Sequence, residues 1–563
     1  MARALPRNSD VAEQLDLLAD LLELEGEASF RVVAYRRAAT RIRETAGSVA
    51  ELALAGRAKE LNGIGKTIEE KIVQVVESGE MHALTKRKNI VPPEVVLFMR
   101  LPGLGPKTAA RIWRELGVTT VEELKHAAEN EQLRTLTGLG AKTEERVLKA
   151  LAEKKQEPSD RRLLGDGLGA LLAVVNVLRA HPAAVEVSEA GSARRRKETF
   201  RDLDIIATAT DAEALIDYFT KLRWVIEVVA KGPSKATVLS NDGLRFDLRV
   251  VPPESYGNLL QHFTGSKDHN VALRERAVKD GLSVSEYSIT VVETGEELCY
   301  GSEAEVYERL GYQFIPPELR ENAGELEAAR KGELPRLVEP ADIKGELHCH
   351  STWSDGKNTL EQMALAARER GCDYLAITDH PRGTLAEQDL EIDQLNERLE
   401  PFRILRGIEV NIRADGSLSL PDEQLAKRDW VIASIHGAFD RSPTERVLAA
   451  MENPHVDMIG HLTARKINIR PPADVDVERV VGKAVETGTF LEINSQPNRL
   501  DLRDTHARLA GEAGVKIAVN TDAHELRALQ HVEMGVAQAR RAWLTKDQVL
   551  NTRSWPQIAK LSK

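Results

Sequence analysis

Histidine and carboxylate side chains recur at the ends of short apolar segments in the sequence after Ile343. The segment GELHCHSTWSDG (345–356) begins the series with a His-x-His pair, and AITDH, GIEV, SIHG, IGHL and NTDAH continue it. The candidate metal ligands are His348, His350, Asp355, His380, Glu409, His436, His461, Asp522 and His524. Six of the 14 histidines stand at such segment ends, too many to be hydrogen-bonded core residues alone.

Nine mixed nitrogen and oxygen ligands exceed the roughly four to six that one ion takes, so the sequence predicts a cluster of two or three Zn²⁺ or Mn²⁺ ions. A carboxylate such as Glu409 can bridge two ions, and a water between them becomes hydroxide near neutral pH. That chemistry is phosphoester hydrolysis. Cys349 lies between two ligands, but strand alternation turns its thiol away from the site.

A second acidic set lies in the middle of the chain. In GSARRRKETFRDLDII (191–206), Asp202 and Asp204 alternate along an expected strand, and Asp247 stands in another strand, RFDLRV. Three carboxylates on neighbouring strands suit two Mg²⁺ or Mn²⁺ ions, which can clamp a triphosphate and activate a hydroxyl. The preceding Gly-Ser and the Arg194–Arg196 run offer contacts to phosphate oxygens.

A Gly-x-Gly turn followed by an amphipathic helix occurs three times, in LNGIGKTIEEKI (from 61), LPGLGPKTAARIW (from 101) and LTGLGAKTEERVL (from 136). The first copy is no phosphate-binding P-loop, because Glu60 stands where that motif needs glycine and no apolar strand precedes it. Hairpins of this kind bring backbone amides to DNA phosphates without reading bases. The predicted DNA-binding glycines are Gly63, Gly65, Gly103, Gly105, Gly138 and Gly140.

Apolar periodicity predicts the elements that hold these residues. Val11, Leu15, Leu18 and Leu22 recur at helical spacing, and the N-terminal third is helical in pattern throughout. From Pro158, β-rich runs such as 203–208 and 244–251 alternate with helices. After Ile343, YLAITDH, WVIASIHG, VDMIGHL, TFLEINS and VKIAVNTD alternate with helical patterns. This rhythm predicts a parallel sheet or barrel whose strand ends meet at one mouth.

Bulk composition limits the class of protein. The 563 residues suggest several domains, no apolar run approaches the roughly 20 residues of a membrane span, and MARALPRNSD lacks a signal core. Three cysteines fit a reducing compartment. The net charge of −11 argues against nucleic-acid binding over the whole surface, but not against local contacts. We expect a cytoplasmic, nucleoid-associated monomer with no membrane contact.

Residues 1 to about 318 resemble the family X DNA polymerases of the nucleotidyltransferase superfamily. AYRRAATRI (34–42) resembles the lyase-type domain of that family, and GNLLQHFTGSKDHNVALRERAVKDGLSVSEYSI (257–289) resembles its thumb. The repeated turns resemble helix-hairpin-helix motifs. The resemblance implies that Asp202, Asp204 and Asp247 are catalytic metal ligands. It implies nucleotide and template contacts by Ser192, Arg195, Arg162, Phe263, Gly265, Asn270 and Arg274.

The sequence departs from the animal repair enzymes of this family at three places. His262 replaces an aromatic residue that helps to exclude ribonucleotides, and Lys267 replaces an acidic residue near the base. Lys71 matches the Schiff-base lysine of the lyase domain, whereas Thr67 replaces a second lysine. Ribonucleotide discrimination and 5′-deoxyribose-phosphate lyase activity therefore stay open.

Residues from about 340 to 563 resemble the polymerase and histidinol phosphatase (PHP) domain, with its four motif regions in order. The resemblance implies a distorted barrel of seven βα units and three ions. His348, His350, Glu409 and Asp522 would hold the first, Glu409, His436 and His461 the second, and Asp355, His380 and His524 the third. Asp355 replaces a histidine of other members, which favours Mn²⁺. Asp379 is expected to orient His380, and Asn494 and Arg499 to contact substrate phosphate.

The expected fold is multidomain α/β. Its parts are a lyase-type helical domain (1–85), a second helix-hairpin-helix domain (86–157), a nucleotidyltransferase palm (158–252), a thumb (253–318), a linker (319–340) and a PHP barrel (341–563).

The leading hypothesis is a DNA repair enzyme that fills gaps from dNTPs and removes 3′ nucleotides from gapped or primed DNA. AP endonuclease and 3′-phosphatase activities would extend the same hydrolysis. One alternative keeps only the nuclease, with a catalytically silent polymerase half as a DNA platform. Others are a small-phosphoester hydrolase and a non-enzymatic end-joining scaffold.

Overall fold

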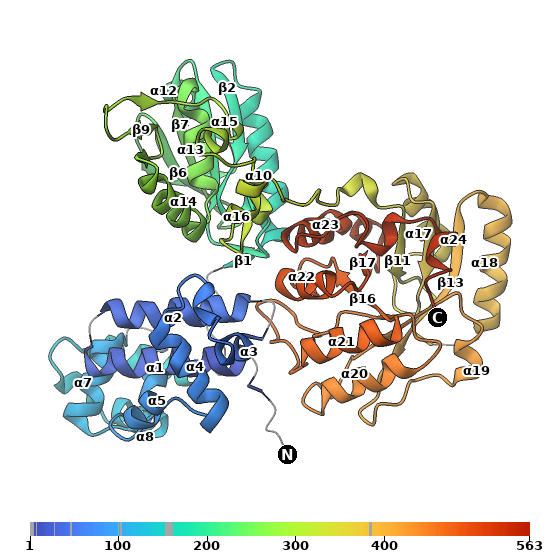
Figure 1. The fold of residues 1–563 in the computed structure, drawn as a ribbon, viewed down its shortest axis with the longest axis horizontal. Helices are drawn as coiled ribbons and strands as arrows, with labels where there is room; N and C mark the ends of the chain where they lie inside the picture. The colour runs from blue at the N-terminus through green and yellow to red at the C-terminus, as the bar shows by residue number, and fades with distance from the viewer. Residues whose placement is uncertain are drawn as a thin grey trace. The chain divides into compact units, whose positions relative to one another are not determined.

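The structure, a computed structural model, describes residues 5–6, 8–27, 29–45, 48–99, 101, 104–152, 161–381 and 385–563. The chain divides into two compact units, Met1–Pro158 and Ser159–Lys563. Figure 1 shows the helical first unit and the mixed architecture of the second. Within the described ranges, no helix is long and apolar enough to cross a bilayer.

The first unit is built from helices around one apolar core. Its helices are α1 (Asn8–Glu25), α2 (Ser29–Glu44), α3 (Val49–Leu54), α4 (Lys66–Ser78), α5 (His82–Lys88), α6 (Val95–Phe98), α7 (Pro106–Leu116), α8 (Val121–Glu129) and α9 (Ala141–Ala152), with 3₁₀ turns η1 (Ala58–Glu60) and η2 (Leu133–Thr135). Helix α1 packs on α2, α5 and α7. Leu15, Leu18 and Leu22 are buried in this core, as their spacing predicts.

The three Gly-x-Gly segments share one backbone hydrogen bond. In each, the amide of the residue between the glycines donates to the carbonyl three positions earlier, as in Ile64 to Leu61 and Leu139 to Leu136, both at 3.0 Å. Gly63 and Gly138 have φ angles of +86° and +87°, a region that favours glycine. The copy that begins at residue 101 has the same bond, from the amide of Leu104, but Gly103 lies outside the described residues.

The second unit begins with the domain expected to be the palm, which is built around a five-stranded sheet of order β2-β4-β7-β6-β5. The strands are β2 (Ala184–Glu189), β4 (Leu203–Ala209), β5 (Val225–Lys231), β6 (Lys235–Ser240) and β7 (Arg245–Val251). Strands β4 and β7 are parallel and the other pairs antiparallel. Around the sheet lie α10 (Leu164–Arg179), α11 (Gly191–Arg194), α12 (Ala212–Thr220) and the short ribbon β1 (Arg162–Leu163) with β3 (Thr199–Phe200).

The domain expected to be the thumb comes next in the chain. It comprises η3 (Pro253–Ser255), α13 (Tyr256–Thr264), α14 (Lys267–Lys279), the small sheet β8 (Leu282–Val284), β9 (Ile289–Val291) and β10 (Glu297–Leu298), and α15 (Glu303–Arg309). Helix α13 packs against α15 and β4.

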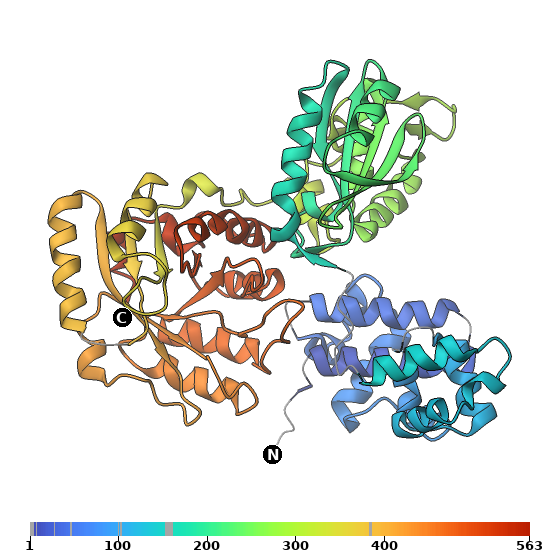
Figure 2. The same cartoon turned by 180° about the vertical axis from the view of Figure 1, so that it is seen from behind.

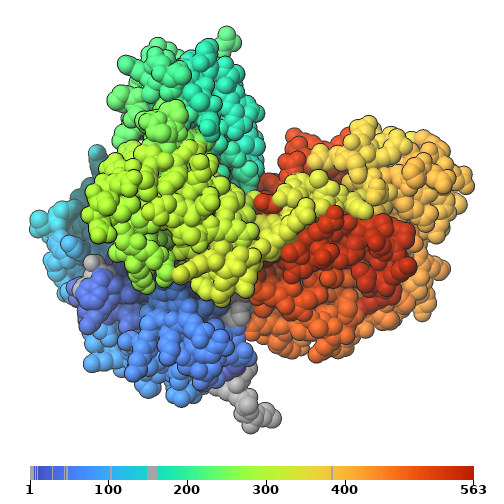
Figure 3. Space-filling model, turned by 45° about the horizontal axis from the view of Figure 1, so that its top comes forward, coloured from blue at the N-terminus to red at the C-terminus, as the bar shows by residue number. Residues whose placement is uncertain are grey.

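The segment expected to be a linker is a packed connection. It contains η4 (Pro317–Leu319), α16 (Glu325–Lys331) and η5 (Pro340–Asp342). Leu319, Ala329 and Leu337 share an apolar cluster with Tyr307 of the thumb and Trp543 of the C-terminal domain. Figure 3 shows this segment, in yellow, lying across the red surface of that domain. Its Pro, Glu and Arg content is typical of an exposed linker, so no sequence pattern indicated these tertiary contacts.

The C-terminal domain is a nearly closed barrel of seven parallel strands, ordered β11 to β17. The strands are β11 (Gly345–Cys349), β12 (Tyr374–Ile377), β13 (Arg403–Asn411), β14 (Trp430–Ser434), β15 (Met458–Ile459), β16 (Phe490–Asn494) and β17 (Ile517–Asn520). The covering elements are α17 (Leu360–Glu369), α18 (Leu385–Leu399), α19 (Asp422–Leu425), α20 (Pro443–Glu452), α21 (Val477–Thr487), α22 (Asp504–Glu512), η6 (Leu526–His531), α23 (Val532–Arg541), η7 (Leu550–Thr552) and α24 (Trp555–Ile558).

The barrel places its helices outside the strands, as Figures 1 and 2 show from opposite sides. A bridge from Cys349 to Ala523 brings the first strand to the segment after the last. Tyr374, Trp430 and Phe490 share one buried cluster, with the rings of Trp430 and Phe490 stacked 5.9 Å apart. The predicted seven-unit barrel is confirmed.

Candidate active sites

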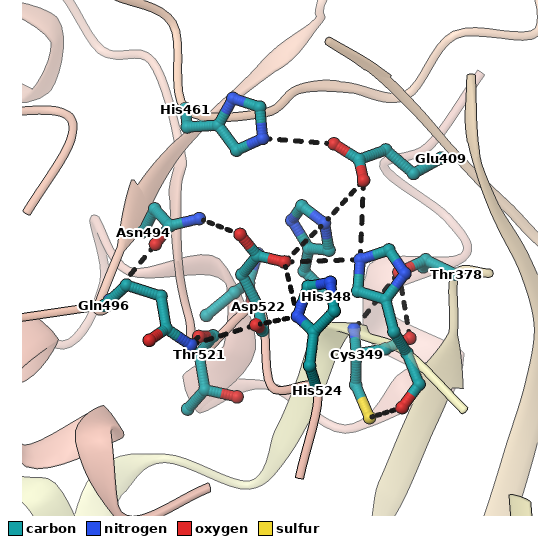
Figure 4. A network of polar contacts seen from close by, with 12 residues as sticks. His348, Cys349, Thr378, Glu409, His461, Asn494, Gln496, Thr521, Asp522 and His524 are labelled. Carbon is teal, nitrogen blue, oxygen red and sulfur yellow. Dashed lines mark hydrogen bonds and ion pairs between the residues drawn. The ribbon is translucent and has the colours of Figure 1, made fainter. Parts of the chain in front are cut away.

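The carboxyl ends of the barrel strands carry all nine predicted PHP ligands. His348 and Glu409 lie near the ends of β11 and β13, and the other ligands follow strand ends in the connecting loops. Parallel strands point their carboxyl ends to one mouth, so residues far apart in sequence meet there. Figure 4 shows His348, Glu409, His461, Asp522 and His524 directed toward one another.

Glu409 lies at the centre of the group and is only 1 % exposed. Its Oε2 atom lies 3.2 Å from His348 Nε2, 3.4 Å from His350 Nε2 and 3.6 Å from His380 Nε2. Its Oε1 atom lies 3.4 Å from His436 Nε2 and 3.2 Å from His461 Nε2. The two oxygens thus face two separate sets of imidazoles, the arrangement that a carboxylate bridging two ions needs.

The remaining carboxylates complete the group. Asp522 Oδ1 lies 3.2 Å from His350 Nε2 and 3.5 Å from His348 Nε2. Asp355 Oδ1 lies 3.6 Å from His350 Nδ1 and 3.5 Å from His524 Nε2. Asp522 and His461 have φ angles of +49° and +22°, a strained conformation that clusters at functional sites.

The donor set fits metal ions better than it fits hydrogen bonding. Most of these nitrogen–oxygen distances exceed the roughly 2.7–3.2 Å of an N–H···O bond, and they match the edge of about 3.3 Å between two ligands of one tetrahedral ion. His348 Nε2, both ring nitrogens of His350 and Glu409 Oε1 are buried without a hydrogen-bond partner. Three triads have ligand atoms close enough to hold one ion: His348/His350/Asp522, His350/Asp355/His380 and His380/Glu409/His436.

The charges of the site favour a cation. Despite burial, which opposes ionisation, neighbouring imidazoles hold the pKa values of Glu409 and Asp522 well below their usual ranges. Burial lowers the pKa of His350, but its interactions with the carboxylates of Asp522 and Glu409 outweigh it and raise that pKa to about 9. When no ion is bound, protons on His348 and His350 can therefore balance the negative charge of these carboxylates.

Several residues that the sequence analysis did not single out hold the ligands in place. Glu492, fully buried, accepts a hydrogen bond from His348 Nδ1 at 2.7 Å and another from the backbone amide of His461 at 2.8 Å. Asn411 Oδ1 lies 2.5 Å from His436 Nδ1. Such contacts fix the orientation of a ligand ring and commonly support metal sites. Both residues stand two positions from a predicted site residue in a strand, so strand alternation could have revealed them.

The expected role of Asp379 is wrong. Its carboxylate accepts hydrogen bonds from Ser351, Ser354 and Gln388, whereas His380 Nδ1 faces the carbonyl of Glu409 at 3.3 Å. Asp379 therefore secures the loop between His350 and Asp355. Adjacent residues at a strand end point in opposite directions, which accounts for the separation.

Of the two expected phosphate contacts, Asn494 lies beneath the site and Arg499 beside it. Asn494 is fully buried, and its amide donates to Asp522 Oδ2 at 2.9 Å. Arg499 Nε lies 3.9 Å from the same oxygen, and its charge lowers the pKa of His461, an effect second to burial. The side chains of Asp355, His436 and His524 are 37 %, 30 % and 36 % exposed, so the cluster is open to solvent at these three residues.

The palm brings the second acidic set together. Asp204 of β4 and Asp247 of β7 are paired neighbours on parallel strands, and Asp202 directly precedes β4. Burial, followed by the charges of Asp247 and Asp202, raises the pKa of Asp204 to about 7. A Cβ atom on Gly191 would lie 2.1 Å from Asp204 Oδ2, so only glycine fits beside this carboxylate.

The predicted nucleotide contacts gather where α11 meets α13. Ser192 and Arg194 lie in α11, and Arg195 caps it, with its guanidinium donating to the carbonyl of Thr264. A Cβ on Gly265 would lie 3.2 Å from Arg195 Nη1. Phe263 stacks with Arg249, whose guanidinium carbon is 4.3 Å from the ring centre.

The other predicted contacts have protein partners of their own. Asn270 is buried and donates to the carbonyl of His262 at 2.7 Å, and Arg274 Nη2 lies 3.3 Å from His262 Nδ1. Arg162 donates to the carbonyl of Asp242, in the turn before β7, at 2.7 Å.

Lys71, the expected lyase residue, lies half-buried on α4. Burial, together with the charge of Arg87, lowers the pKa of its amine. A lowered pKa leaves more of an amine unprotonated and able to form a Schiff base.

Comparisons with known proteins match the three parts of this architecture. The helix-hairpin-helix domain family matches residues 6–81, and the SAM-like helix-hairpin-helix tandem family matches 95–153. The DNA polymerase beta thumb family matches 259–321, and the PHP domain family matches 346–496.

The chain is also similar to whole proteins whose names state an activity. It is 39 % identical over 561 residues to the DNA polymerase/3′-5′ exonuclease PolX of Bacillus subtilis, covering 97 % of both chains. It is 34 % identical over 226 residues to a probable phosphatase of Thermoanaerobacter sp. (strain X514), covering 37 % of this chain and 89 % of that protein. A probable phosphatase of Acetivibrio thermocellus is 31 % identical over 195 residues, covering 32 % of this chain and 78 % of that protein.

Proposed function

The chain belongs to the bacterial family X DNA polymerases that carry a PHP domain, and from this membership and its two sites we propose that it both fills gaps in DNA and trims 3′ ends. The observation that carries the proposal is that one chain contains two separate clusters of candidate metal ligands. Asp202, Asp204 and Asp247 form one, and the nine PHP ligands form the other.

For gap filling, the palm carboxylates would hold Mg²⁺ or Mn²⁺. Bound ions supply charge neutralisation at the triphosphate and lower the pKa of the primer 3′-hydroxyl. Ser192 and Arg195 would hold the triphosphate, while Phe263, Gly265 and Asn270 shape the nucleotide pocket. Arg274 would contact the template side and Arg162 a phosphate. Whether His262, beside Arg274, admits ribonucleotides is answered by comparing incorporation of dNTPs and rNTPs.

For 3′ trimming, the PHP ligands would hold a cluster of Mn²⁺ or Zn²⁺ ions. Bound ions supply Lewis-acid activation of water and of the phosphoryl group. Glu409 holds the two sets of imidazoles around itself, and Arg499, at the site, would bind the scissile phosphate. Arg499→Ala should raise KM for a 3′-recessed duplex about tenfold, because the variant lacks a charge-assisted hydrogen bond to that phosphate. The same chemistry would serve AP endonuclease and 3′-phosphatase reactions.

The helix-hairpin-helix unit would hold gapped or primed DNA through its backbone amides, with Gly63, Gly65, Gly103, Gly105, Gly138 and Gly140 allowing close approach of phosphates. Lys71 would give this unit lyase activity toward 5′-deoxyribose phosphate. Borohydride trapping of a DNA adduct that Lys71→Ala abolishes would establish it. We expect the protein to act as a monomer on nucleoid DNA in the cytoplasm.

One assay separates the two activities. A gapped duplex with labelled primer and Mn²⁺ is given to the wild type, to Asp202→Ala with Asp204→Ala, and to His348→Ala with His350→Ala. The first variant should degrade without extending, and the second should extend without degrading. If the wild type degrades but never extends, the polymerase half is a DNA platform. Faster hydrolysis of histidinol phosphate than of DNA would instead favour a small-phosphoester hydrolase.

A further inference from the structure

The guanidinium of Arg195 donates hydrogen bonds to two acceptors. Its Nε donates to Glu321 Oε1 at 3.0 Å, and its Nη1 donates to the carbonyl of Thr264. Its Nη2 makes no hydrogen bond with any part of the chain that the structure describes. A guanidinium fixed in this way presents its remaining N–H groups in one direction, as a phosphate-binding arginine requires.

Glu321 is in turn held by the barrel domain. Arg541, the last residue of α23, donates from Nη1 to the same Glu321 oxygen at 3.0 Å and to the backbone carbonyl of Arg195 at 2.8 Å. The Arg541 side chain is 2 % exposed, and its other nitrogens bind Asp504 Oδ2 at 3.0 and 2.6 Å. Arg541 of the PHP domain thus contacts the palm segment around Arg195 directly, through the Arg195 carbonyl, and indirectly, through the Glu321 carboxylate.

The charges explain why a second arginine is needed. A carboxylate that orients Arg195 would also repel a triphosphate bound to that arginine. Arg541 and Lys197, whose Nζ lies 3.6 Å from Glu321 Oε2, offset this negative charge. Burial would raise the pKa of Glu321, but these cations lower it to about 2. The carboxylate therefore stays ionised and remains a hydrogen-bond acceptor for Arg195.

We infer that Glu321 and Arg541 are positioning residues of the polymerase site, so that the PHP domain completes the site that binds the triphosphate of the incoming nucleotide. The inference rests on the proposed contact of Arg195 with that triphosphate. Glu321 fixes the direction of Arg195, and Arg541 fixes Glu321 and neutralises it. The fold therefore makes nucleotide affinity depend on a domain that carries a different activity.

The loop has a second anchor that strengthens this dependence. Glu198, three residues after Arg195, pairs with Arg465 of the barrel at 2.7 Å. Arg465 follows the ligand His461 by four residues, and it also donates to the carbonyl of Leu500. The segment between Ser192 and Asp202 is thus held by the PHP domain at two separate points.

The test measures KM and kcat for a dNTP on a gapped duplex with full-length variants. Glu321→Ala should raise KM about tenfold with kcat nearly unchanged, because the charge-assisted hydrogen bond that orients Arg195 is then missing equally in the ground and transition states. Glu321→Gln should stay near the wild type, since its amide oxygen still accepts from Arg195. An unchanged KM in Glu321→Ala would overturn the inference.

Arg541 is tested through a double-mutant cycle. Arg541→Met keeps the aliphatic volume but leaves Glu321 less neutralised, so KM should rise by a similar factor. Adding Glu321→Gln should restore KM, because the repelling charge is gone and the hydrogen bond remains. If the two substitutions simply add, Arg541 has only a structural role and the inference is wrong.

A matched control is the neighbouring residue Arg540, which pairs with Glu318 at 2.8 Å but touches neither Arg195 nor Glu321. Arg540→Met removes a comparable ion pair and should leave the KM for dNTP unchanged; a tenfold rise would assign the effect to weaker docking of the two domains in general. Exonuclease activity reports folding of each variant. If Arg195→Ala leaves KM unchanged, the proposed triphosphate contact fails; if it raises KM while Glu321→Ala does not, the inference alone fails.

Discussion

Replacing Glu492 by glutamine tests how the PHP site is held, because Glu492 supports ligands without belonging to the predicted ligand set. Its Oε1 accepts from His348 Nδ1 at 2.7 Å and from Asn520 Nδ2 at 3.0 Å, and its Oε2 accepts from the His461 amide at 2.8 Å. A glutamine has an oxygen at only one of these positions. At the other, its NH₂ group meets a donor, so at least one buried hydrogen bond cannot form.

The structure sets the size of the effect. Leaving one buried donor unsatisfied costs about 1–3 kcal/mol. If this cost falls on the metal-bound state, metal affinity drops by about 10- to 100-fold, the range typical of residues that orient metal ligands. His348 and His461 are both essentially buried, so neither gains water as a substitute partner.

The assay follows degradation of a 3′-recessed duplex by metal-stripped protein across a range of Mn²⁺ concentrations. Glu492→Gln should raise the Mn²⁺ concentration at half-saturation by about 10- to 100-fold and leave extension by the polymerase site unchanged. Glu486→Gln is the control, since the Glu486 side chain is 70 % exposed in the same domain. A half-saturation within about twofold of the wild type would refute the role assigned to Glu492.

Three further predictions concern the other parts of the chain. Asp247→Asn should slow extension by about 10³-fold, since removing a metal ligand costs several kcal/mol, and should leave degradation unchanged on the same duplex. For metal-free protein, the pKa of Asp204 rises from 3.8 to about 7 on folding, so stability falls as pH rises between these values. Asp204→Asn should therefore raise the unfolding temperature at pH 8 and hardly at pH 4; an equal gain at both contradicts the assignment. Lys66, Lys107 and Lys142 each stand directly after or near a Gly-x-Gly turn. Replacing one of them by glutamine should make the slope of log K against log salt concentration for gapped-duplex binding shallower by about 0.9 for each DNA phosphate that the lysine neutralises. An unchanged slope would show that this lysine does not contact the DNA.

The fold could be predicted where one periodicity dominates a segment. The strands 203–208 and 244–251 and the seven βα units stand out because each strand is an apolar run bounded by polar loops. The connection after Leu319 could not be predicted in the same way. Its composition is typical of an exposed segment, but Arg320 and Glu325 are fully buried by partners in the thumb, Glu303 and His269.

The PHP ligands could be predicted because they obey a geometric rule: residues at the carboxyl ends of parallel strands meet. The residues that hold those ligands follow a weaker rule, strand alternation, which places Glu492 beside Asn494 and Asn411 beside Glu409 on one face. Glu321 and Arg541 follow no local rule, since 220 positions separate residues that share a 3.0 Å hydrogen bond. Only a folded chain reveals such pairs.

The packed connection changes how a primer end can reach both sites. Several charge-assisted pairs join the palm and the connection to the barrel, and three of them are Glu198 with Arg465, Glu318 with Arg540, and Glu321 with Arg541. If each contributes only about 1 kcal/mol, a barrel that has swung away is populated below about one part in a hundred. A freely swinging PHP domain is therefore a poor account of how the DNA end changes sites. The DNA itself must then move between the two sites, and the helix-hairpin-helix unit, which we propose to hold its backbone, is the candidate for that task.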